Sequence, residues 1–351
     1  MTWAAIRCFS PRRRRTEWRI RPTSSEASPC SGDTPPPGRA ARPVMGTTNC
    51  APSSGAISGV RSCAGRPAPS PRSSGRARTV GPARPRPGRE RMTGGARPSF
   101  PVTGGGRIVV NTPSEAALLS AVEERLSAGR GFTVATLNLD HLVKLRRDPA
   151  FRDAYAATDL VVADGRPVVW LAKLQRAPVR LAPGSDLTAP LCAVAARLGA
   201  PIALFGASPE ALETAAARLA RDIPDLRVVH SESPPYGFDP AGTEADACIH
   251  RIADSGARLC LVALGAPKQE IFAVRASARA PGAGFVSIGA GLDFAAGTQK
   301  RAPRLARRLG LEWLWRLLSD PRRLGGRYAA CAAALPGLVA DSLRTRPVVG
   351  E

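Results

Sequence analysis

The chain has 351 residues and a formal net charge of +22, and most of that charge lies near its N-terminus. Residues 1–100 hold 19 of the 50 Lys and Arg residues, all of them Arg, but only 4 of the 28 acidic residues. The remainder is only mildly basic, which argues against nucleic-acid binding by the whole protein. No apolar run reaches the roughly 18 residues of a membrane span.

The first hundred residues also contain 15 of the 34 prolines and keep no apolar period of a helix or strand. Such a segment cannot bury enough surface to offset its ordering entropy, so we predict that residues 1–100 are disordered. Arg without Lys, among Pro, Ala and Gly, is also typical of GC-rich sequence translated upstream of a true start. Met92 is then a candidate start, and Met45 is another. The alternative, a basic arm that binds nucleic acid, is less favoured because aromatic residues are not interleaved with the arginines.

The cysteines and the N-terminus indicate a reducing compartment. None of the eight cysteines forms a CxxC pair, which argues against zinc and thiol-redox roles. The basic stretch at 12–15 is not followed by the apolar run of a secretory signal. We therefore expect a cytoplasmic protein without a bound metal or cofactor.

From residue 107 on, apolar runs alternate with segments of helical period. Strands are predicted at 107–110, 131–138, 160–163, 202–207, 226–230, 257–265 and 284–290. Helices are predicted at 114–129, at 139–156 with a break near Pro149, at 187–199 and at 208–223. This alternation predicts an α/β, Rossmann-like domain over 101–300, with a mostly parallel sheet and helices on both faces. Residues 301–351 are amphipathic and lack strands, which predicts a separate helical appendage.

Polar side chains follow two of the predicted strands. Thr136 and Asn138 end the strand at 131–138, and Asp164 follows the strand at 160–163. The carboxyl ends of parallel strands form the edge at which α/β proteins bind ligands. These groups could hold a sugar hydroxyl and accept its proton. Alternatively, Asn138 and Asp164 cap the helices that follow, and taken alone the pattern favours this interpretation.

Three glycine-containing turns are further candidates for ligand binding. Their residues are Gly206 in LFGASPE, Gly265, Lys268 and Gln269 in LVALGAPKQE, and Asp293 in the Gly-rich stretch 287–303. Backbone N–H groups at a helix start suit a phosphate, and Lys or Gln there suits phosphate, sugar or base. Ordinary strand-to-helix turns, a solvated first turn and an irregular loop are the alternatives. No GxGxxG is present, so a nicotinamide-dependent oxidoreductase is poorly supported.

The segment 310–328 combines tryptophan with arginine. Four arginines, Arg316, Arg322, Arg323 and Arg327, surround an apolar face that includes Trp313. This composition fits a helix at a membrane interface or an arginine cluster that binds a diphosphate. A helix packed on its own domain or on another subunit fits equally well.

Taken together and in order, these motifs resemble the WecG/TagA/CpsF family of bacterial glycosyltransferases. The resemblance runs over residues 107–328 through TLNLDHL, VVADGRPVVW, GSDL, LFGASPE, LGAPKQE, GAGLDFAAG, RAP and GLEWLWRLLSDPRR. It implies inverting, metal-independent transfer of N-acetylmannosamine, glucose or a similar sugar from a UDP-sugar to a polyprenyl-diphosphate-linked sugar. Such an enzyme would act in exopolysaccharide or cell-surface polysaccharide synthesis, peripherally on the inner face of the cytoplasmic membrane. A homo-oligomer is compatible with the sequence, and no nucleic-acid partner is expected.

The resemblance also implies roles for particular residues. The catalytic base of the family falls on Asp164, and Gly165 and Arg166 lie in the same matched motif. Thr136, Asn138 and Gln269 match polar groups of its active pocket. Lys268 and the arginines of 310–328 are candidates to stabilise the UDP leaving group or the acceptor diphosphate, although Gly325 and Gly326 interrupt the basic helix before Arg327. The alternatives are a non-catalytic protein that binds nucleotide sugars and a nucleotide-dependent oxidoreductase.

Overall fold

The computed structural model describes residues 95–299, 303 and 312–349. The expectations of disorder, of an alternative start and of a basic arm concern residues 1–94 and lie outside this range, apart from the last residues before 101. Residues 95–100 belong to the ordered part, because β1 (Ala96–Arg97) and β2 (Ser99–Pro101) lie there and the Phe100 side chain is fully buried.

Six parallel strands form one sheet, in the order β5-β4-β9-β8-β6-β7. They are β4 (Phe132–Leu137), β5 (Leu160–Ala163), β6 (Ile202–Gly206), β7 (Val228–Glu232), β8 (Leu259–Ala263) and β9 (Gly284–Ser287). All but the edge strand β7 are buried along their whole length, as continuous apolar runs covered on both faces should be. The predicted α/β, mostly parallel architecture is therefore confirmed.

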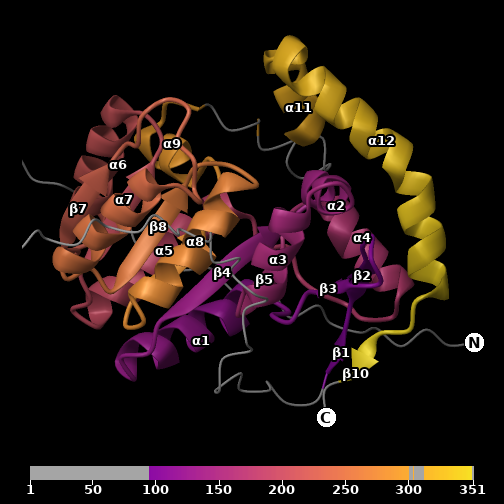
Figure 1. The fold of residues 1–351 in the computed structure, drawn as a ribbon, viewed down its shortest axis with the longest axis horizontal. Helices are drawn as coiled ribbons and strands as arrows, with labels where there is room; N and C mark the ends of the chain where they lie inside the picture. The colour runs from indigo at the N-terminus through magenta and orange to yellow at the C-terminus, as the bar shows by residue number, and fades with distance from the viewer. Residues whose placement is uncertain (1–94, 300–302, 304–311, 350–351) are drawn as a thin grey trace, which may run out of the picture. The chain divides into compact units, whose positions relative to one another are not determined.

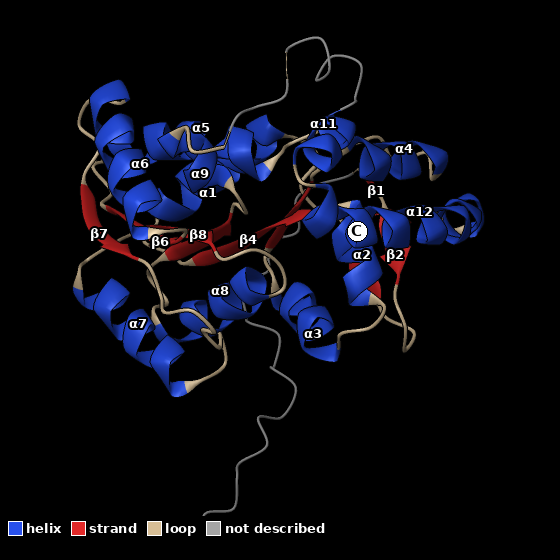
Figure 2. Ribbon diagram, turned by 90° about the horizontal axis from the view of Figure 1, so that it is seen from above, coloured by secondary structure: helices blue, strands red, loops and turns tan. Residues whose placement is uncertain are grey.

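Helices cover both faces of this sheet (Figures 1 and 2). One face carries α1 (Glu115–Ser127), α5 (Gly184–Arg197), α6 (Pro209–Asp222) and α9 (Gly291–Ala296). The other carries α2 (Leu139–Leu145), α3 (Pro149–Ala157), α7 (Thr243–Asp254) and α8 (Lys268–Arg279). Alternate residues of one strand serve the two cores: Phe132 and Val134 pack on the first face, and Ala135 and Leu137 on the second. The helix α4 (Arg166–Leu174) joins the second core.

Two small antiparallel pairs lie outside the main sheet. The strand β1 pairs with β10 (Val348–Val349), and β2 pairs with β3 (Arg107–Val109). The predicted strand at 107–110 is thus present, but it forms a hairpin with β2 instead of extending the parallel sheet.

The C-terminal helices α11 (Glu312–Ser319) and α12 (Pro321–Arg344) follow the α/β part, and α12 packs against α2, α4 and β2. Leu338 belongs to the same buried cluster as β4 and β5. Arg146 forms an ion pair with Asp341 at 3.0 Å, and Gln175 donates a hydrogen bond to Ser342 at 3.4 Å. Within the described ranges, no helix is long and apolar enough to cross a membrane.

One stretch differs from its sequence-based description. The Gly-rich segment 287–303 was expected to be a loop, but residues 291–296 form α9, which ends at Gly297 with a left-handed φ of 73°. A Cβ at Gly291 would lie 2.5 Å from the Thr188 hydroxyl oxygen. The glycine therefore allows α9 to pack closely on α5, a requirement that only the tertiary structure reveals.

Candidate active site

The ends of β4 and β5 bring two polar residues side by side. Leu137 pairs with Ala163 in the parallel register, so Asn138 and Asp164 follow at neighbouring positions. The Asn138 amide donates to the Asp164 carboxylate at 3.5 Å, and the Asp164 backbone N–H donates to the Leu137 carbonyl at 2.7 Å. A half-buried carboxylate and an amide thus meet at the carboxyl edge of the sheet.

The two residues differ in how they relate to the helices that follow. Asn138 is the N-cap of α2, and its side-chain oxygen accepts the His141 backbone N–H at 3.0 Å. Asp164 is not the N-cap of α4, because Gly165 holds that position with a φ of 94°. As a glycine, Gly165 has no side chain that could cap α4. The capping alternative therefore applies to Asn138 and not to Asp164.

Hydrogen bonds among buried polar side chains link the end of β4 to β9 and α3. The Thr136 hydroxyl donates to the Ser287 carbonyl of β9 at 3.5 Å, and the Tyr155 hydroxyl donates to the Thr136 carbonyl at 3.4 Å. The His141 ring hydrogen-bonds to the Tyr155 hydroxyl at 2.7 Å. Burial lowers the pKa of His141 to about 3, so the imidazole is neutral at physiological pH and serves packing.

A second set of buried polar side chains lies at the start of α8. The Gln269 amide donates to a Glu270 carboxyl oxygen at 2.7 Å and accepts the Gly289 backbone N–H at 3.0 Å. Both side chains are almost fully buried, and the other Glu270 oxygen has no hydrogen-bond partner among the described residues. Burial raises the pKa of Glu270 to about 7, although the Gln269 hydrogen bond opposes that shift.

The burial of Glu270 does not follow from the sequence, because an acidic residue in a first helical turn normally faces water and favours the helix dipole. Gln269 was expected to bind substrate. In the structure its amide links α8 to the turn after β9, and its role in binding stays a prediction.

The turns after β8 and β6 differ in whether an N-cap side chain hydrogen-bonds to the helix that follows. After β8, α8 has no side-chain cap, while the Lys268 ammonium donates to the Phe238 carbonyl at 2.8 Å. After β6, the Ser208 hydroxyl caps α6. A Cβ at Gly206 would lie 2.5 Å from the Ala263 carbonyl oxygen, so this glycine is needed for close strand packing. The start of α8 therefore lacks the N-cap hydrogen bond that Ser208 gives α6.

The remaining predicted residues lie along the same edge or on α12. Gly265 takes a left-handed φ of 73° before α8, Arg166 is the first residue of α4, and Asp293 lies half-buried in the first turn of α9. Because β9 lies beside β8, the turns that carry Asp293 and Gly265 are neighbours, whereas Arg166 follows β5, which β4 separates from β9. The side chains of Arg316 and Arg323 lie outside the described part, and Arg322 is exposed.

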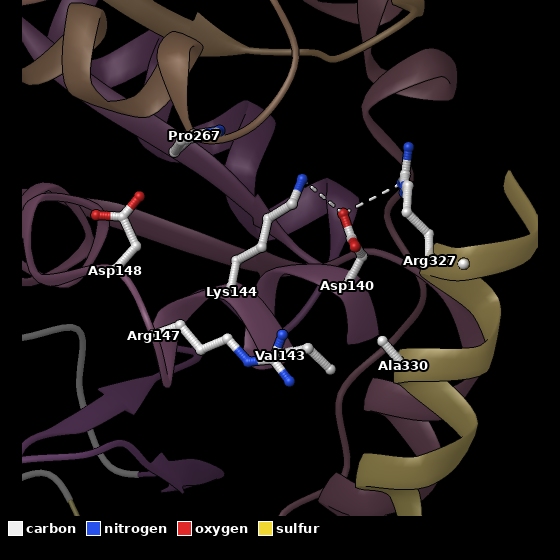
Figure 3. Close-up of a pocket in the computed structure, with 9 residues that line it drawn as sticks. Asp140, Val143, Lys144, Arg147, Asp148, Pro267, Arg327 and Ala330 are labelled. Atoms are coloured by element: carbon white, nitrogen blue, oxygen red, sulfur yellow. Dashed lines mark ion pairs between the residues drawn. The ribbon is translucent and has the colours of Figure 1, made fainter. Parts of the chain in front are cut away.

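A cavity of about 420 Å³ lies between α2, the turn before α8 and α12 (Figure 3). Its walls include Asp140, Lys144, Arg147 and Arg327. Asp140 pairs with Lys144 at 2.8 Å and with Arg327 at 3.2 Å. Among the four candidate arginines, Arg327 is thus placed at a cavity wall, where it contacts the helix that Asn138 caps.

One cluster in the described part has metal-ligating side chains, formed by Glu232, Glu244 and Cys248 near the edge strand β7. The Arg251 guanidinium lies 2.6 Å from Glu232 and 3.3 Å from Glu244. Burial and the neighbouring Glu232 raise the pKa of Cys248 to about 12, so its sulfur stays a thiol. An arginine already supplies the positive charge that a cation would bring, so the cluster fits a structural ion pair.

The family model described as the glycosyl transferase WecG/TagA/CpsF family matches residues 105–347 of this chain. The matched residues include the whole six-stranded sheet, the turns after β4 and β5, and all of α12.

Proposed function

This chain belongs to the WecG/TagA/CpsF family of glycosyl transferases, and from that premise we propose that it transfers a sugar from a UDP-sugar to a polyprenyl-diphosphate-linked sugar. The donor would be UDP-N-acetylmannosamine, UDP-glucose or a related compound, and the product would enter a cell-surface polysaccharide. The observation that carries the proposal is the half-buried Asp164 carboxylate, which lies beside Asn138 at the carboxyl edge of the sheet.

In this mechanism Asp164 is the general base. The acceptor hydroxyl loses its proton to the Asp164 carboxylate while its oxygen bonds to the anomeric carbon of the donor. The bond between that carbon and the phosphate oxygen breaks, and its electron pair leaves with UDP. A single displacement inverts the anomeric centre. Asn138 hydrogen-bonds to Asp164 and would hold the carboxylate toward the acceptor.

The departing UDP needs positive partners for its developing charge. Arg166 and Lys268 lie in the first turns of α4 and α8, whose N-cap residues, Gly165 and Pro267, form no side-chain cap. These groups are our candidates for diphosphate binding. Arg327, at the cavity between α2 and α12, is a candidate for the diphosphate of the lipid-linked acceptor.

The test is a transfer assay with the full chain, a panel of UDP-sugars and a short polyprenyl-diphosphate-linked sugar. We expect one or a few donors to be consumed, with release of UDP and an inverted glycosidic linkage in the product. A retained anomeric configuration would overturn the single-displacement mechanism. Binding of UDP-sugars without turnover of any acceptor would favour the alternative of a non-catalytic nucleotide-sugar-binding protein.

A further inference from the structure

The helix α4 and the chain after it expose an unusual number of large apolar side chains. Trp170 is 58% exposed, Leu174 is 42% exposed and Leu181 is 38% exposed. The opposite side of α4 is well packed, because Val168 and Leu171 are buried in the core beneath β5. Trp170 and Leu174 are four residues apart in α4, so they lie on the same side of the helix, opposite its buried side.

The same surface is strongly basic. Lys173, Arg176 and Arg180 are all exposed there, and no acidic residue occurs between Asp164 and Asp186. Lys173 and Arg176 make no ion pair with any residue that the structure describes.

We propose that this α4 surface, formed by Trp170, Lys173, Leu174, Arg176, Arg180 and Leu181, docks on an anionic phospholipid membrane. Tryptophan and leucine surrounded by lysine and arginine are the composition of helices that lie in the membrane interface. Tryptophan prefers the headgroup level, and each basic residue near an anionic leaflet adds attraction.

A second copy of the chain is a poorer occupant of this surface. A two-fold contact through α4 would bring the basic residues of both copies together, with no acidic residue in either surface to neutralise them. Like charges brought face to face across an interface are costly. An anionic bilayer has the opposite charge, so it satisfies both the apolar and the basic part of the surface.

The surface is also close in the chain to the proposed base, because α4 begins two residues after Asp164. Docking through α4 would bring the carboxyl edge of β5 near the membrane, where a lipid-linked acceptor resides. Membrane docking through α4 does not depend on glycosyl transfer by Asp164. An experiment can therefore contradict one of these two proposals and leave the other intact. Docking through α4 is also distinct from the membrane role expected for the C-terminal helices, since α4 belongs to the α/β part.

The test is flotation of the full chain with phosphatidylcholine vesicles, with and without phosphatidylglycerol. We expect the wild type to float with the anionic vesicles. The affinity of the double variant Lys173→Glu/Arg176→Glu for these vesicles should fall by roughly tenfold or more, because two attractions become repulsions. Trp170→Ser/Leu174→Ser should also weaken binding, with no change of salt dependence.

Control residues are available near β7, at the edge of the sheet opposite β5. Tyr236 is fully exposed in the loop after β7, and Arg227 is exposed just before that strand. Tyr236→Ser and Arg227→Glu should bind vesicles as the wild type does. Equal binding by the α4 variants and the wild type would overturn the proposal, as would equal losses in the controls. A change of oligomeric state in the α4 variants, with unchanged vesicle binding, would show a contact between copies instead. Transfer to a water-soluble acceptor should be unaffected by these substitutions.

Discussion

The turns after β5 and after β6 are built from similar residues but present different groups. Each follows a buried strand and contains a glycine, a small polar or acidic residue and a proline at the start of the next helix. After β6, Ser208 is the N-cap, and its hydroxyl accepts the Ala211 backbone N–H at 3.2 Å. After β5, Gly165 is the N-cap, and the acidic residue stands one position earlier.

This offset of one residue distinguishes Ser208, which caps a helix, from Asp164, for which we propose a chemical role. The residue immediately before the first helical position is the usual one to cap a helix with its side chain. Ser208 lies at this position in α6, and its hydroxyl accepts a backbone N–H of that helix. Asp164 lies one residue before the N-cap Gly165, at the carboxyl edge of the sheet. Four substitutions test the contrast.

Asp164→Asn should have the largest effect. Asparagine keeps the shape of the side chain but cannot accept a proton, so turnover should fall by about 10²-fold or more. Thermal stability should stay near that of the wild type, because asparagine keeps a side-chain oxygen that can accept the Asn138 hydrogen bond. Transfer kinetics and melting of the same preparation measure both. Unchanged turnover would remove Asp164 from the mechanism, and a large loss of stability would return it to a structural role.

Glu270→Gln tests a third turn, in which a first-turn carboxylate is buried instead of exposed. The exposed Glu210 of α6 has its pKa lowered by hydrogen bonds with its own backbone N–H and with Ser208, whereas burial raises the pKa of Glu270 from 4.5 to about 7. The folded state therefore binds this proton more tightly than the unfolded state does. The free energy of unfolding should fall as the pH rises from about 4.5 to about 7.

The glutamine variant should lose that slope and, above pH 7, should be more stable than the wild type by on the order of 2 kcal/mol. Urea unfolding at several pH values measures this difference. Glu213→Gln is the control, because Glu213 is an exposed residue of α6. An equal slope in wild type and Glu270→Gln would mean that the carboxyl group finds a partner or water in solution.

Much of this arrangement could be predicted from the sequence, because its causes are local. Continuous apolar runs predicted the strands, and the helices predicted from residues 114 and 208 do begin there, with Ser114 and Ser208 as their N-caps. The neighbouring placement of Asn138 and Asp164 follows from parallel pairing of their strands. The helix α9 was missed because close packing at Gly291 involves a residue of α5 far away in the sequence. The burial of Glu270 was missed for the same reason, since α8 is covered by β9 and α3.

Gly165→Ala tests whether the cap itself must be a glycine. At a φ of 94° an alanine would be strained, so we expect a loss of roughly 1–2 kcal/mol of stability. Space does not limit the substitution, since a Cβ there would meet its nearest neighbours at 3.8 Å. Turnover should fall as well if relaxation of the backbone moves Asp164 away from Asn138. Gly199→Ala, at a φ of 60° in open space after α5, is the control for strain without a neighbouring carboxylate. An equal loss of turnover in both variants would show that the site does not depend on the Gly165 conformation.

Ser208→Ala should have the smallest effect and should separate the two turns most clearly. Removing the hydroxyl leaves the Ala211 N–H without its cap, which should lower stability by about 1 kcal/mol. Turnover should not change if the turn after β6 serves only to start α6. Ser208→Asp, which retains a capping oxygen, should recover most of the stability, since aspartate caps about as well as serine. A weaker affinity for UDP-sugar in Ser208→Ala, not restored by Ser208→Asp, would mean that this hydroxyl contacts the donor. The turn after β6 would then belong to the site along with the turns after β4 and β5.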